Sequence, residues 1–190
     1  MDADTAAGTL EHVRVVQRRA RQSLSSFWFP LLVFGGLTLG SLVVIVLANG
    51  PAMGVYWALA GTVGGIATGR HYRQRERELG LELPPAPYVA VGAGIVVGCL
   101  FAGAVAGALE AERAAALGPS LVVAVGYAIF AWLDRSVVLE AVSGLLGALT
   151  LVVALANLGA TPTAFVLALA YGIVGVAGGL YFRAVEQGHG

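Results

Sequence analysis

The chain has 190 residues, of which 58% are hydrophobic and 12% are charged, and its 11 basic and 11 acidic residues cancel to a formal net charge of zero. A soluble domain is about half apolar and about a quarter charged, so this composition indicates an integral membrane protein. The neutral balance gives no basic surface for nucleic acid, and the single cysteine, Cys99, excludes an internal disulfide and a cysteine-based metal cluster.

Residues 1–26 precede the first long apolar run. On a helical wheel for 9–26, Arg14, Arg18 and Arg21 fall together beside an apolar arc. This pattern predicts an amphipathic helix on the inner membrane surface, with its guanidinium groups toward anionic headgroups. Such a helix serves either as an interfacial anchor for the first span or as a docking arm for a partner. The run that begins at Phe27 is too long for the apolar part of a signal peptide, so we expect it to be retained.

Six apolar runs approach the roughly 20 residues that a helix needs to cross a bilayer. They cover residues 27–48, 51–69, 88–109, 119–133, 137–158 and 162–182. The fourth run is the shortest. It either gains length from 114–117 or is closely bounded by Asp134 and Arg135. We therefore predict an all-α bundle of six transmembrane helices over 27–183, with a short tail at 184–190.

The arginines predict the orientation of these spans. Ten of the eleven precede the first run or follow the second, fourth or sixth, which places them on one side of the membrane. Only Arg113 follows an odd-numbered run, the third, and lies on the other side. The positive-inside rule then places both termini in the cytoplasm, with the protein in the plasma membrane. After Arg70 we expect the second helix to continue to about Gly80, with Arg75 and Glu78 paired at helical spacing, before prolines stop it.

The three connections opposite the arginines resemble one another. They read Asn49-Gly50-Pro51, Leu117-Gly118-Pro119 and Leu158-Gly159-Ala160-Thr161-Pro162, and proline suits the first turn of a returning helix. Residues 42–49 also resemble 151–157. The pattern predicts three helical hairpins in parallel repeat, although spans rich in Ala, Gly, Val and Leu also resemble one another through composition alone.

Glycines recur at four-residue spacing in four of the runs. Small residues at this spacing let transmembrane helices approach closely, either within one chain or between copies in a homo-oligomer. The predicted helix-packing positions are Gly36, Gly40, Gly61, Gly65, Gly69, Gly94, Gly98, Gly103, Gly107, Gly175 and Gly179.

Few polar residues fall within the runs. Glu140 lies one turn inside the fifth run, so it is either a proton or cation site or a partner for Arg135 or Arg70 near the interface. Asp134 is expected at the inner boundary, and Tyr127 and Tyr171 either line a cavity or pack as aromatic core. These residues form the candidate transport or ion-pair site.

The sequence contains no recognisable set of catalytic residues. The three histidines, His12, His71 and His189, fall outside the runs, which argues against a haem or zinc site inside the bundle. We therefore expect no enzyme activity and no cofactor.

The segments 18–23 and 27–35, the pair Tyr56-Trp57, and 71–75 resemble the start of small integral membrane proteins common in actinobacteria. The resemblance covers about the first 90 residues and implies a six-span membrane protein. It implies no activity and no site residues.

Two functions are consistent with these sequence features. The first is a compact subunit in the lipid bilayer that assembles with itself or with a membrane-protein partner. The second is a small transporter or channel, for an apolar solute or coupled to protons through Glu140, because repeats with interrupted helices are typical of transporters. The sparse polar lining argues against a polar solute and favours the first function, and a membrane enzyme ranks third.

Overall fold

The computed structural model describes residues 27–47, 51–79 and 86–187. The predicted surface helix with Arg14, Arg18 and Arg21 therefore lies outside the described residues. The described chain contains six α-helices and no strand. They are α2 (Trp28–Leu47), α3 (Pro51–Leu79), α4 (Ala86–Ala108), α5 (Ala114–Asp134), α6 (Val137–Leu155) and α7 (Ala160–Gln187).

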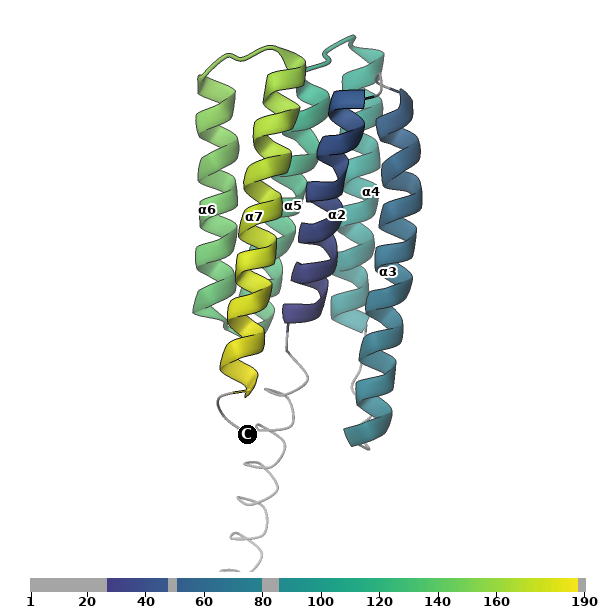
Figure 1. Cartoon of the computed structure of the whole chain (residues 1–190), viewed down its shortest axis with the longest axis vertical. Coiled ribbons are helices and arrows are strands. Elements are labelled where there is room, and N and C mark those ends of the chain that lie inside the picture. The colour runs from purple at the N-terminus through teal and green to yellow at the C-terminus, as the bar shows by residue number, and fades with distance from the viewer. Residues whose placement is uncertain (1–26, 48–50, 80–85, 188–190) are drawn as a thin grey trace, which may run out of the picture.

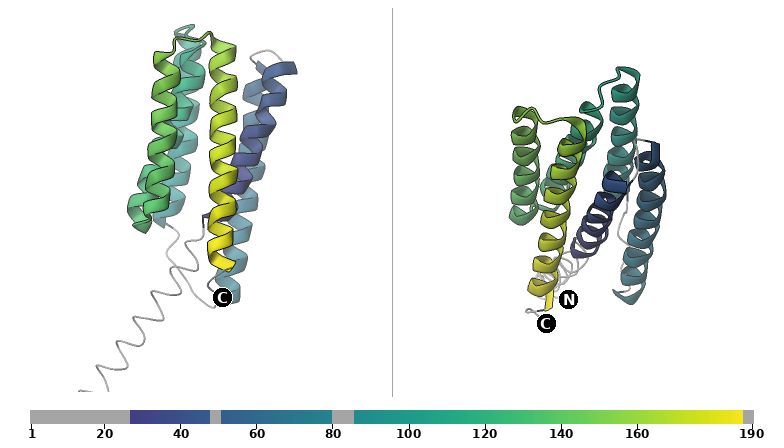
Figure 2. Two further views of the ribbon diagram at one scale, coloured as in Figure 1. Left: turned by 60° about the vertical axis from the view of Figure 1, so that its left-hand side comes forward. Right: turned by 45° about the horizontal axis from the view of Figure 1, so that its top comes forward.

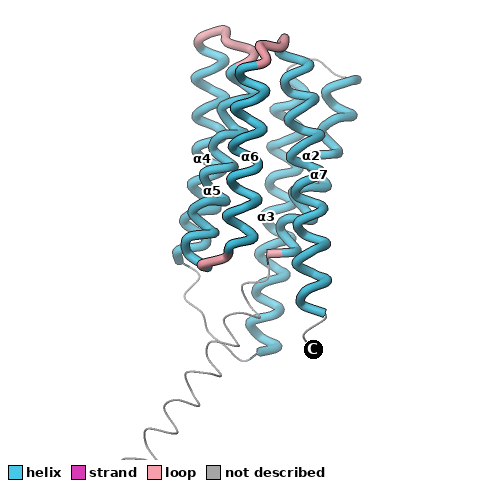
Figure 3. The backbone as a smooth tube through the Cα atoms, turned by 90° about the vertical axis from the view of Figure 1, so that its left-hand side faces the viewer, coloured by secondary structure: helices cyan, strands magenta, loops and turns pink. Residues whose placement is uncertain are grey.

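The helices stand side by side in one bundle, and successive helices alternate in direction (Figures 1 and 2). The described connections lie at the two ends of the bundle (Figure 3). One end holds the start of α2, the last turns of α3 and α7, and the turn between α5 and α6. Because Arg70, Arg135 and Arg183 belong to these segments, we call it the arginine end. The far end holds Arg113.

Five helices, α2, α4, α5, α6 and α7, are long and apolar enough to cross a membrane. The prediction of an all-helical membrane protein is therefore confirmed, with five helices rather than six that meet this criterion among the described residues. The helix α3 has 29 residues and is not among the five, because glycines, threonines and the arginine-rich last third lower its apolarity. It does extend past Arg70 to Leu79, as the sequence predicted.

The short fourth run gains length from 114–117, which is one of the two alternatives that the sequence left open. Helix α5 begins at Ala114, so Pro119 lies inside a helix of 21 residues, where its missing N–H removes a single backbone bond. The chain turns earlier, at Glu110, whose φ of 52° is left-handed. The Ala111 N–H donates to the Ala106 carbonyl at 2.8 Å, which closes the end of α4 without the glycine that the sequence pattern required.

The most extensive contact joins α2 and α7, the first and last described helices. Glycines allow the two backbones to approach. A Cβ atom on Gly35 would lie 2.7 Å from the Val176 nitrogen, and one on Gly179 would lie 2.9 Å from the Trp28 carbonyl oxygen. Leu31, fully buried on α2, packs with Leu139 of α6 in the core beside them. Close helix packing of this kind is a main source of cohesion where no water is expelled.

The other contacts run α2 to α3, α7 to α6, α6 to α5 and α5 to α4, with a smaller contact between α5 and α7. Between α3 and α4 the described residues make almost no contact. Each of these two helices therefore has one extensive neighbour. Since α2 packs mainly on α7 and α5 packs on α6 as closely as on α4, the packing does not divide into three hairpins. The predicted hairpin repeat remains a prediction.

Candidate functional site

Glu140 lies in the first turn of α6, and its side chain is exposed. Ser136 caps this helix by accepting a hydrogen bond from the Leu139 N–H at 3.4 Å, and a carboxylate in the first turn, such as that of Glu140, is favourable at a helix N-terminus. Arg135 is exposed and left-handed, with φ of 52°. Among the described residues no ion pair within 4 Å joins Glu140 to Arg135 or Arg70.

Asp134 has a different environment, although it is one residue from Arg135. The Tyr88 hydroxyl of α4 donates a hydrogen bond to Asp134 Oδ1. The other carboxylate oxygen, Oδ2, is buried and has no hydrogen-bond partner among the described residues. The sequence therefore identified a residue of interest at this position, while its neighbour Arg135 and the nearby Glu140 lie apart from it.

Aromatic rings surround this carboxylate at the arginine end. Phe130 stacks on Tyr88 with ring centroids 6.2 Å apart, and Phe27 lies 5.4 Å from Phe130. Tyr72 of α3 interacts electrostatically with Asp134 and with Tyr127. Burial, followed by the charge of Asp134, raises the pKa of Tyr72 well above its ordinary value. Helices α3 and α4 thus place Tyr72 and Tyr88 near the carboxylate of Asp134, whereas Tyr127 packs against the hydrophobic core.

Tyr171 belongs to a separate polar group deeper in the bundle. Its hydroxyl lies 2.7 Å from the Thr150 hydroxyl and donates to the Ser120 carbonyl at 2.8 Å. Ser143 donates to the Ala124 carbonyl at 3.0 Å. These bonds tie α5, α6 and α7 together and satisfy the hydroxyls that they join. Tyr171 therefore does not lie with Asp134, contrary to their grouping as one candidate site.

A second cluster at the arginine end joins α2, α3 and α7. His71 stacks on Phe29, with ring centroids 4.1 Å apart and an interplanar angle of 10°, and meets Trp28 edge-on at 5.3 Å. Its Nε2 atom is buried without a hydrogen-bond partner among the described residues. Burial lowers the pKa of His71, and the positive charge of Arg75 lowers it further. The imidazole is therefore held in its neutral form.

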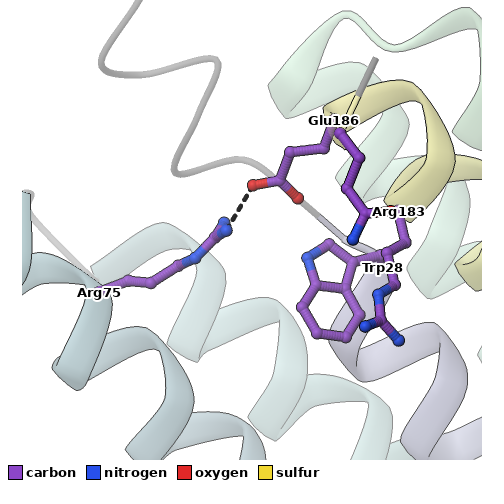
Figure 4. A pocket seen from close by; sticks show the side chains of 5 residues that line it. Trp28, Arg75, Arg183 and Glu186 are labelled. Carbon is purple, nitrogen blue, oxygen red and sulfur yellow. Dashed lines mark hydrogen bonds and ion pairs between the residues drawn. The ribbon is translucent and has the colours of Figure 1, made fainter. Parts of the chain in front are cut away.

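Arg75 forms an ion pair with Glu186, 111 residues along the chain, rather than with Glu78 as the helical spacing suggested. Gln74 instead bonds Glu78, at 3.3 Å. The Arg183 guanidinium lies over the Trp28 ring, 5.3 Å from its centroid. A cavity of about 250 Å³ lies between the ends of the helices (Figure 4). It is lined by Trp28, Arg75, Arg183, Glu186 and Gln187.

The positive-inside rule placed Arg75 and Arg183 on the same side of the membrane. The sequence did not predict that these residues meet in one cavity, because the cavity joins residues from Trp28 to Glu186, almost the whole length of the chain. The usable signal was topological. A six-helix bundle with alternating directions places the start of α2 and the ends of α3 and α7 at one end (Figure 1).

Arg113, the one arginine at the far end, serves the fold. Its guanidinium donates to the Asn157 side chain and to the carbonyls of Val153, at 3.3 Å, and Ala154. These carbonyls belong to the last turn of α6, where backbone acceptors lack helical partners and a positive charge is favourable. Arg113 therefore lies on the opposite side from the other ten arginines because it caps the end of α6.

Four of the eleven predicted packing glycines lie against a neighbouring helix. A Cβ atom on Gly40 would lie 2.7 Å from the Tyr56 hydroxyl, and one on Gly98 would lie 2.8 Å from Val122; Gly175 and Gly179 face α2. The other seven have nothing among the described residues within 4 Å of such an atom. They are Gly36, Gly61, Gly65, Gly69, Gly94, Gly103 and Gly107. The spacing missed four glycines at which an added Cβ would lie closer than 3.0 Å to another atom, namely Gly35, Gly64, Gly126 and Gly172.

Among the described residues, no group of three or more His, Cys, Asp or Glu side chains is arranged to hold a metal ion. Comparison with protein families, with curated proteins and with solved structures finds no match to this chain. The candidate function therefore rests on the geometry of the bundle and its arginine end.

Proposed function

We propose that the chain is a six-span integral membrane protein of the plasma membrane that acts as an assembly subunit, joining a second copy of itself through α3. The arginine end faces the cytoplasm in this proposal. Helix α2 runs away from the arginine end and α4 begins at it (Figure 1). If α2 and α4 cross the membrane, α3 must carry the chain back across, which makes it the sixth span.

The observation that carries the assembly proposal is an open glycine face on α3. Gly54, Gly61, Gly65 and Gly69 follow one another at spacings of seven, four and four residues, and each has nothing within 4 Å of an added Cβ. This spacing keeps them on one side of a helix. Gly64, which faces Phe34 and Leu37 of α2, lies on a different side.

A helix face that contacts lipid alone has no need of glycine, because larger apolar side chains fit there equally well. Helices in lipid associate through close van der Waals packing, for which glycine faces are suited. Helix α3 is also the least apolar of the six and has one extensive neighbour, α2. Contact with a second copy would cover this weakly apolar helix, and two identical glycine faces can meet about a two-fold axis.

The experiment is the oligomeric state of the full chain, extracted gently and measured by size-exclusion light scattering. We expect a defined oligomer that Gly65→Leu converts to monomer. Gly144→Leu is the matched control, because Gly144 of α6 is also exposed with nothing within 4 Å. A monomeric wild-type protein, or equal effects of the two substitutions, would contradict the proposal.

One observation favours a second candidate, proton-coupled transport. The buried Oδ2 of Asp134 lacks a partner among the described residues, and an incompletely satisfied carboxyl among tyrosines can exchange a proton. In this candidate the proton site is Asp134 rather than Glu140. Asp134→Asn should abolish pH-driven flux in liposomes while Glu140→Gln leaves it intact. Flux unaffected by Asp134→Asn would remove the basis of this candidate.

A further inference from the structure

We propose that the cavity between Trp28, Arg75 and Arg183 at the arginine end binds a phosphate group, carried by the headgroup of an anionic lipid. The proposal rests on the placement of the bundle in a membrane given above. It does not depend on whether α3 assembles with a second copy.

The first support is the balance of charge. Arg75 and Arg183 contribute two positive charges to the wall of the cavity, and Glu186 contributes one negative charge that Arg75 pairs. The wall therefore carries a net charge of +1, from two arginines and one glutamate. The ion pair joins α3 to α7 at the site, and the Arg183 guanidinium lies over the Trp28 ring (Figure 4).

The second support is an unused hydrogen-bond donor. The indole N–H of Trp28 is buried and has no acceptor among the described residues. In Figure 4 the indole nitrogen faces the side of the cavity where Arg75 meets Glu186. A buried donor without a partner costs about 1–3 kcal/mol, which an anionic oxygen placed in the cavity would recover. Guanidinium groups and an indole N–H offer donors alone, and phosphate oxygens offer acceptors alone.

The third support is the surrounding charge and the apolar boundary. A second cavity is lined by Arg70 and Arg73 together with Ile66 and Gly69 of α3. Guanidinium groups therefore follow apolar helix surface at the arginine end, which is the arrangement expected where a headgroup phosphate sits above acyl chains. An interfacial tryptophan such as Trp28 also favours this depth. A free phosphate ion would use the same donors but would gain nothing from the apolar surface.

The test is native mass spectrometry of the full-length protein in mixed micelles, titrated separately with phosphatidylglycerol, phosphatidylcholine and sodium phosphate. We expect preferential retention of phosphatidylglycerol. Arg183→Gln should weaken it about fivefold, the effect of one arginine near an anionic surface. Trp28→Phe, which keeps the ring and removes the N–H, should also weaken it by about fivefold. Arg135→Gln, at an exposed arginine of the same end outside the cavity, is the matched control.

Each outcome decides the proposal. Loss of lipid retention in Arg183→Gln and Trp28→Phe, but not in Arg135→Gln, supports the lipid headgroup. Binding of sodium phosphate with the same dependence supports a phosphate site and assigns it to the free ion. Equal retention of the two lipids, or equal behaviour of Arg183→Gln and Arg135→Gln, overturns the site. The same spectra report the oligomer, so Gly65→Leu losing the oligomer while keeping the lipid separates the two proposals.

Discussion

Gly35 of α2 lies against Gly175 of α7 so closely that a Cβ atom on Gly175 would stand 2.9 Å from the Gly35 Cα atom. The close atoms are backbone on both sides, so no side chain can rotate away. This contact joins the first and last described helices and lies beside the buried core at Leu31. It sets the distance between α2 and α7.

Gly35→Ala should therefore destabilise the bundle, by about 1–3 kcal/mol in the free energy of unfolding, as expected for overpacking. Gly36→Ala is the control, because the adjacent glycine has nothing within 4 Å of its added methyl group. It should be neutral or slightly stabilising, since alanine favours helix over glycine by about 1 kcal/mol. Unfolding of the purified protein in detergent measures both. Equal losses would show that the contact is not specific to Gly35.

The contrast between Gly35 and Gly36 also shows what the sequence could predict. Four-residue spacing correctly indicates that glycines share a face of a helix, and it selected Gly36 with Gly40. Spacing within one helix says nothing about which face meets a neighbour, and here α7 meets the face of Gly35. The helices themselves were accessible to prediction because each depends on a local run of apolar residues.

The same distinction applies to the candidate site. Asp134 was predicted at the inner boundary because it directly follows an apolar run. Its partner Tyr88 and the pair of Arg75 with Glu186 were not, because these contacts join residues 46 and 111 positions apart. The turn before α5 was not predicted, because the left-handed residue there is Glu110 rather than a glycine.

The capping of α6 by Arg113 gives a second prediction. Arg113→Gln removes the charge and most of the donors that reach Val153, Ala154 and Asn157. The loss should be about 1.5–3 kcal/mol, the range for hydrogen bonds to charged groups. Arg73→Gln, at an exposed arginine of α3, should change stability little. Thermal unfolding distinguishes the two, and an unchanged midpoint in Arg113→Gln would show that the cap contributes nothing.

The environment of His71 predicts a dependence on pH. Burial, and then Arg75, lower the pKa of His71 in the folded protein, while Glu186 and Glu78 oppose this in part. Below about pH 6.5 the unfolded chain therefore binds a proton that the folded chain does not. Stability contributed by neutral His71 is present above that pH and is lost as the pH falls toward the lowered value.

His71→Phe should remove this dependence, because phenylalanine keeps the ring between Phe29 and Trp28 and cannot be protonated. The measurement is the unfolding midpoint at pH 7.5 and pH 5.5 for both proteins. The wild type should lose more stability on acidification than the variant. Parallel losses in the two proteins would assign the pH dependence to other groups.

Tyr171→Phe tests the polar group that joins α5, α6 and α7. The substitution keeps the ring and removes a hydroxyl that contacts the Thr150 hydroxyl and donates to the Ser120 carbonyl. Thr150 keeps its own bond to the Leu146 carbonyl at 2.9 Å, so it is not left without a partner. The expected loss is about 0.6–1.7 kcal/mol, the range measured for hydrogen bonds between transmembrane helices.

Tyr181→Phe is the matched control for this substitution, because the Tyr181 side chain is 56% exposed at the arginine end of α7. Removing its hydroxyl should leave the unfolding midpoint unchanged. If Tyr171→Phe is equally silent, the three helices are held by packing alone. A loss of flux in Tyr171→Phe without a loss of stability would instead indicate that the hydroxyl acts on a solute, and weight would move to transport. Stability loss without any change in flux is the outcome that fits an assembly subunit, in which these bonds keep α5, α6 and α7 fixed behind the open face of α3.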